Sequence, residues 1–105
     1  MAVLGIDVSR YQGTIDWEQV KRSDVQFAMI RAGYGNNNID TNFRRNILEC
    51  NRLGIPCGAY WFSYALNTEM ARNEARFCAN ALGPYQVDYP VSYDLEYESM
   101  AYATQ

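Results

Sequence analysis

Two acidic residues separated by one leucine are the part of this sequence best suited to chemistry. Asp94, Leu95 and Glu96 end an apolar run that opens after Pro90, as at the end of a β-strand. Side chains alternate along a strand, so the two acids are expected on one face, about 6–7 Å apart. Such a pair can divide into one protonated acid and one anion, as glycoside cleavage requires. The pattern alone is common and favours a solvated strand end.

The elements that would position this pair alternate between strands and helices. Apolar runs predict four strands, over residues 3–9, 27–33, 57–64 and 91–97. A short helix is predicted over 17–22, a second from Thr41 or Asn42 to Gly54, and a longer one from Asn67 or Thr68 to residue 82. Residues 34–38 are predicted to form a polar loop. Strands that alternate with helices indicate parallel βαβ units, and hence an α/β fold.

Capping residues and apolar stripes support the three helices. Asp16 followed by Gln19 fits a capping box at the first helix, and Gly54 fits the end of the second. The spacing of apolar residues predicts the buried stripes of the second and third helices. These stripes are Phe43, Ile47 and Cys50 on the second helix, and Ala71, Ala75, Cys78 and Leu82 on the third.

Composition excludes several classes of function. The chain has 105 residues, a net charge of −3 and a single lysine, Lys21, so we expect neither a nucleic-acid surface nor an anionic-membrane patch. Histidine is absent, and the three cysteines, Cys50, Cys57 and Cys78, match no metal-binding spacing. We therefore expect buried cysteines and no metal or other cofactor. Chemistry must come from carboxylates, tyrosines or arginines.

Four motifs in a fixed order carry a resemblance to a known family. They are Gly-Ile-Asp-Val-Ser at 5–9 with Tyr-Gln-Gly at 11–13, Asp-Trp at 16–17, Ile-Pro-Cys-Gly-Ala-Tyr-Trp-Phe at 55–62, and Tyr-Asp-Leu-Glu at 93–96. In this order and spacing the chain resembles the glycoside hydrolase family 25 lysozymes, the Chalaropsis-type muramidases. The resemblance covers nearly the whole chain. One departure is Tyr34, where many family members carry an acid in a Lys-Ala-Thr-Glu-Gly type ending.

The resemblance implies a β/α barrel of TIM type that cleaves the β-1,4 bond after N-acetylmuramic acid in peptidoglycan. Glu96 would be the general acid and Asp94 its partner anion, which either attacks directly or orients the substrate's acetamido group. Asp7, at the carboxyl end of the first strand, would tune charge or bind the sugar.

Aromatic residues and one arginine are further site candidates. Tyr60, Tyr34 and Tyr64 are expected to bind the sugar, whereas Trp61 is expected to pack against a helix. Arg31, which strand alternation would place with Met29 and Gly33, is a candidate counterion for Asp94 and substrate contact. A surface arginine or a structural ion pair is the equally weighted alternative.

The length of the chain fits only part of such a barrel. A β/α barrel takes about 200–250 residues, so residues 1–105 are predicted to be one partial domain, the amino-terminal half with about four β/α units. Its open edges predict association, including pairing of two copies. The alternative to a lysozyme is a truncated, inactive fragment that self-associates or only binds cell wall. Without a signal peptide in this chain, we expect a bacterial or phage lysin acting outside the cell or on the wall.

Overall fold

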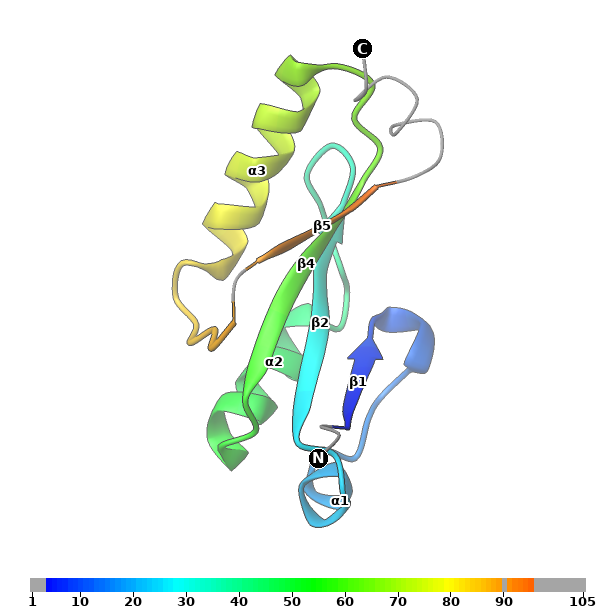
Figure 1. Cartoon of the computed structure of the whole chain (residues 1–105), viewed down its shortest axis with the longest axis vertical. Coiled ribbons are helices and arrows are strands. Elements are labelled where there is room, and N and C mark those ends of the chain that lie inside the picture. The colour runs from blue at the N-terminus through cyan, green and yellow to red at the C-terminus, as the bar shows by residue number, and fades with distance from the viewer. Residues whose placement is uncertain (1–3, 90, 96–105) are drawn as a thin grey trace.

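The structure is a computed structural model that describes residues 4–89 and 91–95, with the backbone alone described over 92–95. Five strands, three α-helices and a 3₁₀ turn follow one another along the chain (Figure 1). In order they are β1 (Gly5–Val8), η1 (Arg10–Gln12), α1 (Trp17–Arg22), β2 (Phe27–Tyr34), β3 (Asn38–Ile39), α2 (Phe43–Leu53), β4 (Cys57–Ser63), α3 (Thr68–Leu82) and β5 (Ser92–Leu95).

Four of the strands form a parallel path in the order β1-β2-β4-β5. This confirms the predicted parallel βαβ arrangement, and it places all four carboxyl ends at one edge of the sheet. The prediction of a loop over residues 34–38 was partly wrong. Its end belongs to β3, which pairs antiparallel with the end of β2 through Gly33 to Ile39 and Tyr34 to Asn38. Two-residue strands carry no apolar period, so the sequence pattern missed this one.

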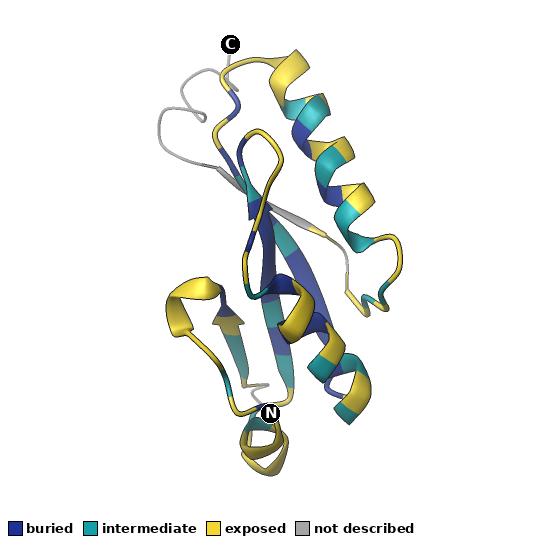
Figure 2. Ribbon diagram, turned by 180° about the vertical axis from the view of Figure 1, so that it is seen from behind, coloured by how far each residue is buried: buried dark blue, intermediate teal, exposed yellow. Residues whose placement is uncertain are grey.

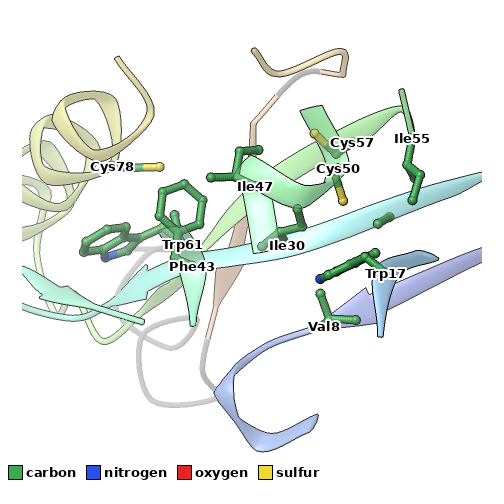
Figure 3. Close-up of a cluster of buried hydrophobic side chains, with 12 residues drawn as sticks. Val8, Trp17, Ile30, Phe43, Ile47, Cys50, Ile55, Cys57, Trp61 and Cys78 are labelled. Carbon is green, nitrogen blue, oxygen red and sulfur yellow. The ribbon is translucent and has the colours of Figure 1, made fainter. Parts of the chain in front are cut away.

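Helices α2 and α3 pack against one face of the sheet. Helix α2 lies behind the strands in Figure 1 and in front of them in Figure 2, and α3 lies to the side of the strands in both views. The core lies between these layers and is closed by Trp17 of α1, which is buried and donates from Nε1 to Asn46 Oδ1 at 3.0 Å. Figure 3 shows its main members. They are Val8, Trp17, Ile30, Phe43, Ile47, Cys50, Ile55, Cys57, Trp61 and Cys78.

The helix boundaries follow the predicted capping residues. Asp16 accepts from Gln19 N at 3.2 Å to begin α1, and Asn67 accepts from Met70 N at 2.8 Å to begin α3. Gly54 ends α2 in the left-handed conformation, with φ of 69°, which costs a glycine little.

The buried stripe of α3 differs from the prediction. Ala75 is exposed, and its neighbour Glu74 is buried instead, with 3% of its surface exposed. The Glu74 carboxylate accepts hydrogen bonds from Ser63 Oγ at 2.6 Å and from Tyr64 N at 3.0 Å. These partners compensate the loss of water that burial of a carboxylate entails. The prediction for the α2 stripe of Phe43, Ile47 and Cys50 is confirmed.

A bulge in β2 changes which residues share a face. Arg31 pairs with Tyr60 of β4, but Gly33 pairs with Trp61, because the register shifts between Arg31 and Gly33. The expectation that Gly33 shares a face with Arg31 was therefore wrong, since Tyr60 and Trp61 point to opposite faces. The bulge turns the end of β2 so that Gly33 lies against the Trp61 ring on the helix side.

Two glycines leave room for large side chains on the sheet face opposite the helices. A Cβ at Gly5 would overlap the ring of Phe27, and one at Gly58 would lie 2.6 Å from Met29 Sδ. Phe27 and Met29 are half-buried on this face, and the Phe27 ring also meets Tyr89, at 5.8 Å between centroids. Small residues on this face thus let apolar side chains pack across neighbouring strands.

The three cysteines are free and buried, as predicted. Interaction between the thiols of Cys50 and Cys57 raises the pKa of Cys50 and lowers that of Cys57, and burial raises the pKa of Cys78. Across the described residues, no helix combines the length and apolar character needed to cross a bilayer.

Candidate active-site edge

The candidate residues that the structure describes lie on the four parallel strands, from the middles of the strands to the carboxyl edge of the sheet, or directly after a strand. Asp7 is the third residue of β1, is exposed, and pairs in register with Met29. Asp94 is the third residue of β5 and pairs in register with Phe62 of β4. The two acids therefore lie on the first and last strands of the parallel path. The side chain of Asp94 and all of Glu96 lie outside the described residues, so their predicted proximity to Asp7 stays a prediction.

Arg31 forms a buried ion pair at this edge. Its Nε donates to Asp40 Oδ2 at 2.8 Å, and the two side chains are 8% and 0% exposed. Asp40 also accepts from Arg10 N at 3.0 Å and from Asn42 N at 2.9 Å. This is the structural ion pair that the sequence left open as an alternative. The proposed contact of Arg31 with Asp94 remains a prediction.

The guanidinium of Arg31 lies over two tyrosine rings. Its Cζ is 4.8 Å from the centroid of Tyr34 and 5.2 Å from that of Tyr11. Arg10 Cζ lies over the same two rings, at 5.6 and 5.2 Å, respectively. We call Arg10, Tyr11, Arg31 and Tyr34 the arginine–tyrosine cluster. Arg31 Nη2 is buried with no hydrogen-bond partner among the described residues, and these ring contacts partly compensate it.

Tyr11 is the exposed member of this cluster, with 73% of its surface accessible. Its hydroxyl accepts from Arg10 Nη2 at 3.5 Å; this contact raises the pKa of Arg10 and lowers that of Tyr11. Arg10, Tyr11 and Asp40 were not predicted as site residues. Asp40 stands two residues before Asn42, the N-cap of α2, where Asp is common because it forms turns, so nothing local distinguished its ion pair.

Two of the candidate tyrosines lie at strand ends, since Tyr34 ends β2 and Tyr64 follows β4. Tyr34 meets Tyr64 edge-to-face at 6.5 Å between centroids, and Tyr64 meets Phe62 at 5.5 Å. Tyr64 is 49% exposed, whereas Tyr60 is half-buried in β4, in register with Arg31 and Ser92. Trp61 is fully buried and packs 6.5 Å from Phe77 of α3, as expected for a residue that faces a helix.

A pocket of about 540 Å³ opens beside Tyr34 and Tyr64. It lies between α3 and the turn that connects β2 to β3. Its lining comprises Tyr34, Gly35, Asn36, Asn38, Tyr64, Met70, Asn73, Glu74 and Phe77. Aromatic faces and amide side chains together suit a ligand with both apolar and hydrogen-bonding surfaces, which is the chemistry of a sugar ring.

Comparison with known families places this arrangement in context. The model of glycosyl hydrolases family 25 matches residues 6–105, which is nearly the whole chain. Lysozyme M1 of Streptomyces globisporus is 44% identical over 61 residues, which cover 58% of this chain and 21% of that protein. The chain thus spans about a fifth of the length of this relative.

Solved structures match the fold closely. The modular autolysin LytC from Streptococcus pneumoniae, solved in complex with a synthetic peptidoglycan ligand, superposes with a TM-score of 0.82 at 36% identity. The match covers 88% of this chain and 22% of LytC. The catalytic domain of endolysin ply40 from bacteriophage P40 of Listeria monocytogenes gives a TM-score of 0.84 at 23% identity, which speaks to the fold alone; here 93% of this chain covers 50% of that domain.

Proposed function

This chain belongs to glycosyl hydrolase family 25, and we propose that it is the amino-terminal part of a lysozyme domain. The reaction is hydrolysis of the β-1,4 bond between N-acetylmuramic acid and N-acetylglucosamine in bacterial peptidoglycan. Support comes from the family match over residues 6–105 and from relatives named as a lysozyme and an autolysin. The site of action is then the bacterial cell wall, which fits the similarity to an autolysin solved with a peptidoglycan ligand.

The described strands are the first four β/α units of a TIM-type barrel in this proposal. All four run parallel in the order β1-β2-β4-β5, and helices α2 and α3 cover one face, as barrel helices do. A barrel of this type has eight strands, and the chain covers 50% of the ply40 catalytic domain. The face opposite the helices, which carries Asp7 by alternation with Gly5, would then be the barrel interior.

Three carboxylates carry the chemistry in this proposal. Glu96 protonates the leaving oxygen, and Asp94 either attacks the anomeric carbon or orients the substrate's acetamido group to do so. Asp7 supplies a third negative charge, and neighbouring carboxylates favour retention of a proton on one of them. The observation that carries the proposal is the parallel sheet, since it gives Asp7 and Asp94 strand ends at a common edge.

Substrate contacts come from the same edge. Tyr60, Tyr34 and Tyr64 offer ring faces and hydroxyls to the sugar. Asp40 holds the guanidinium of Arg31 in place. Arg31 therefore contributes to sugar binding from a fixed position, together with the Tyr34 ring that it contacts. No cofactor takes part in this scheme.

Lysis of purified bacterial walls tests the proposal. We expect the parent chain to lower the turbidity of a wall suspension and to release new reducing ends on N-acetylmuramic acid. Glu96→Gln should lose roughly 10²–10⁴-fold of this rate, the usual contribution of a general acid. Glu18→Gln, which alters an exposed residue of α1, is the matched control and should keep the parent rate. Equal lysis by parent and Glu96→Gln would overturn the assignment of Glu96.

A non-catalytic wall-binding or self-associating fragment is the second candidate. The outer strands β1 and β5 end the strand order, and open strand edges favour association between copies. This candidate predicts co-sedimentation with walls, or a dimer by light scattering, without new reducing ends from either variant. A monomer at high concentration would count against pairing of two copies.

A further inference from the structure

The turn between α2 and β4 brings two cysteines together. Cys50 lies in the last turn of α2, and Cys57 is the first residue of β4. Gly54 turns the chain back between them, so that Ile55 N donates to Cys50 O at 2.9 Å. Both cysteines are fully buried members of the core, and Figure 3 shows their side chains next to one another. The pair lies at the amino end of β4, whereas the candidate acids belong to the opposite, carboxyl edge.

The contacts of the Cys57 sulfur tie it to the end of α2. Asn51, the neighbour of Cys50, donates from Nδ2 to Cys57 Sγ at 3.9 Å, and Cys57 Sγ donates to Gln86 O at 3.6 Å. The two thiols also interact with each other, which raises the pKa of Cys50 and lowers that of Cys57. Cys57 therefore forms the thiolate more readily, and the thiolate is the nucleophilic form of cysteine.

A small pocket leads from the surface to this pair. Its volume is about 90 Å³, and its lining comprises Cys50, Asn51, Gly54, Ile55, Pro56, Gln86 and Asp88. Gly54, Pro56 and Gln86 are exposed, so the pocket opens to solvent. Two of the lining residues, Asn51 and Gln86, contact Cys57 Sγ directly. A space of this size holds a few water-sized molecules, and it excludes an oxidant as large as oxidised glutathione.

We infer that Cys50 and Cys57 form an oxidisable thiol pair, which a small hydroperoxide converts into a disulfide that joins the end of α2 to the start of β4. The Cys57 thiolate attacks one oxygen of hydrogen peroxide. The O–O bond breaks, the released hydroxide takes up a proton to become water, and Cys57 becomes a sulfenic acid.

Cys50 completes the reaction. Its sulfur attacks the sulfur of Cys57, and the proton of Cys50 leaves with the sulfenic hydroxyl as a second water. The two thiols lose two electrons in total, and these reduce the peroxide to two water molecules. Oxidation of Cys57 also removes the thiol contact that raised the pKa of Cys50, so Cys50 is free to react. The bond closes the loop 50–57 and restricts the unfolded chain, which should stabilise the fold.

Peptide mapping of the native chain tests the inference. The chain is treated with hydrogen peroxide, its remaining thiols are alkylated, and the sample is then unfolded and digested. Trypsin cuts after Arg45, Arg52, Arg72 and Arg76, so the three cysteines fall on three separate peptides. We expect one linked pair of peptides, 46–52 with 53–72, while Cys78 stays alkylated. The oxidised chain should also unfold at a higher urea concentration than the reduced chain.

Two comparisons test the neighbouring thiol and the pocket route. Cys78→Ala is the matched control, since burial alone shifts the pKa of Cys78, and it should form the same link as the parent. Cys50→Ala should form no link. The rate with hydrogen peroxide, divided by the rate with oxidised glutathione, should be larger for the native chain than for the chain in urea, where both oxidants reach both sulfurs.

Four results would overturn the inference. They are three unlinked cysteines in the treated native chain, a link that includes Cys78, the same rate ratio in the native and unfolded chains, and a urea midpoint that oxidation leaves unchanged or lowers. The first two results would remove the thiol pair itself. The third would remove the route through the pocket, and the fourth would remove the stabilising role of the bond. None of these readouts depends on lysis of cell walls, so the proposed lysozyme activity stands or falls separately.

Discussion

Arg31 and Asp40 form an ion pair that joins β2 to the segment before α2, with 2.8 Å between Nε and Oδ2. Both side chains are almost fully buried, and Asp40 also accepts from two backbone amides, those of Arg10 and Asn42. One carboxylate thus fixes three segments of chain beside the Tyr34 ring.

Loss of the Asp40 charge should destabilise the fold strongly. Asp40→Asn leaves the Arg31 guanidinium buried without its counterion, and we expect a loss of about 3–5 kcal/mol in the free energy of unfolding. Urea denaturation followed by circular dichroism measures this loss. Glu18→Gln removes an exposed carboxylate 3.2 Å from Arg52, and it should cost no more than about 1 kcal/mol. Similar losses in both variants would contradict the structural role of the buried pair.

Replacement of Gly33 by alanine should be costly because the bulge of β2 leaves no space for a side chain. The added Cβ would overlap Asn38 O and lie 2.6 Å from Cζ3 of the Trp61 ring. Overpacking of this kind costs roughly 1–3 kcal/mol.

Gly83→Ala should have the opposite effect on the free energy of unfolding, and urea denaturation measures both glycine variants. Gly83 has a right-handed helical conformation, and its nearest contact to a new Cβ is 3.6 Å. We expect it to be neutral or to stabilise by up to about 1 kcal/mol. A tolerated Gly33→Ala would mean that β2 does not carry the bulge.

Asp88 should contribute to the loss of stability in acid. Hydrogen bonds from Gln86 Nε2 at 3.0 Å and from Cys57 N at 2.9 Å lower the pKa of its carboxyl group. A carboxyl group whose pKa is lowered in the folded state stabilises the fold at pH values above its unfolded-state pKa, which is about 4. This stabilisation is lost as the pH falls through the folded-state pKa. Asp88→Asn should therefore show a smaller drop of its urea midpoint below pH 4 than the parent. Asp24→Asn, an exposed control, should follow the parent curve; a parental curve for Asp88→Asn would refute the role.

The buried carboxylate of Glu74 should matter more than its helical position suggests. Glu74→Ala leaves Ser63 Oγ and Tyr64 N without this acceptor, and we expect a loss of roughly 2–4 kcal/mol from two charge-assisted hydrogen bonds. Glu69→Ala, in the exposed first turn of α3, should lose no more than about 1 kcal/mol through the helix dipole. Thermal denaturation of both variants tests the difference. Equal midpoints would show that Ser63 and Tyr64 find other partners.

Local features of the sequence were sufficient to predict the helices and the parallel strands. The caps at Asp16 and Asn67 and the left-handed glycine Gly54 depend on contacts within one turn of chain. The local sequence is therefore enough to predict them. The strand β3 and the bulge before Gly33 depend on pairing between segments, which no local pattern encodes.

The difference between local patterns and contacts with distant residues also separates the residues that were predicted from those that were missed. The tyrosines were selected because aromatic side chains suit sugars wherever they lie on a strand. The ion pair of Asp40 and the burial of Glu74 each require a partner nine or more residues away. The helical pattern favours an alanine over a glutamate for burial, because it does not show the partners of Glu74 in β4 and the residue after it. The prediction that Ala75 is buried was therefore wrong.

Gly5 and Gly58 carry no Cβ on the sheet face opposite the helices, which favours bending of the sheet toward that face. Asp7 and Asp94 lie on the first and last strands of the parallel path, which are three inter-strand spacings apart. In a flat sheet, their backbones would be separated by about 14 Å. Concave bending shortens that span, and it crowds the side chains of the inner surface. Gly5 and Gly58 relieve this crowding, since neither places a Cβ on that surface, and so favour a shorter span between the strands that carry the two acids.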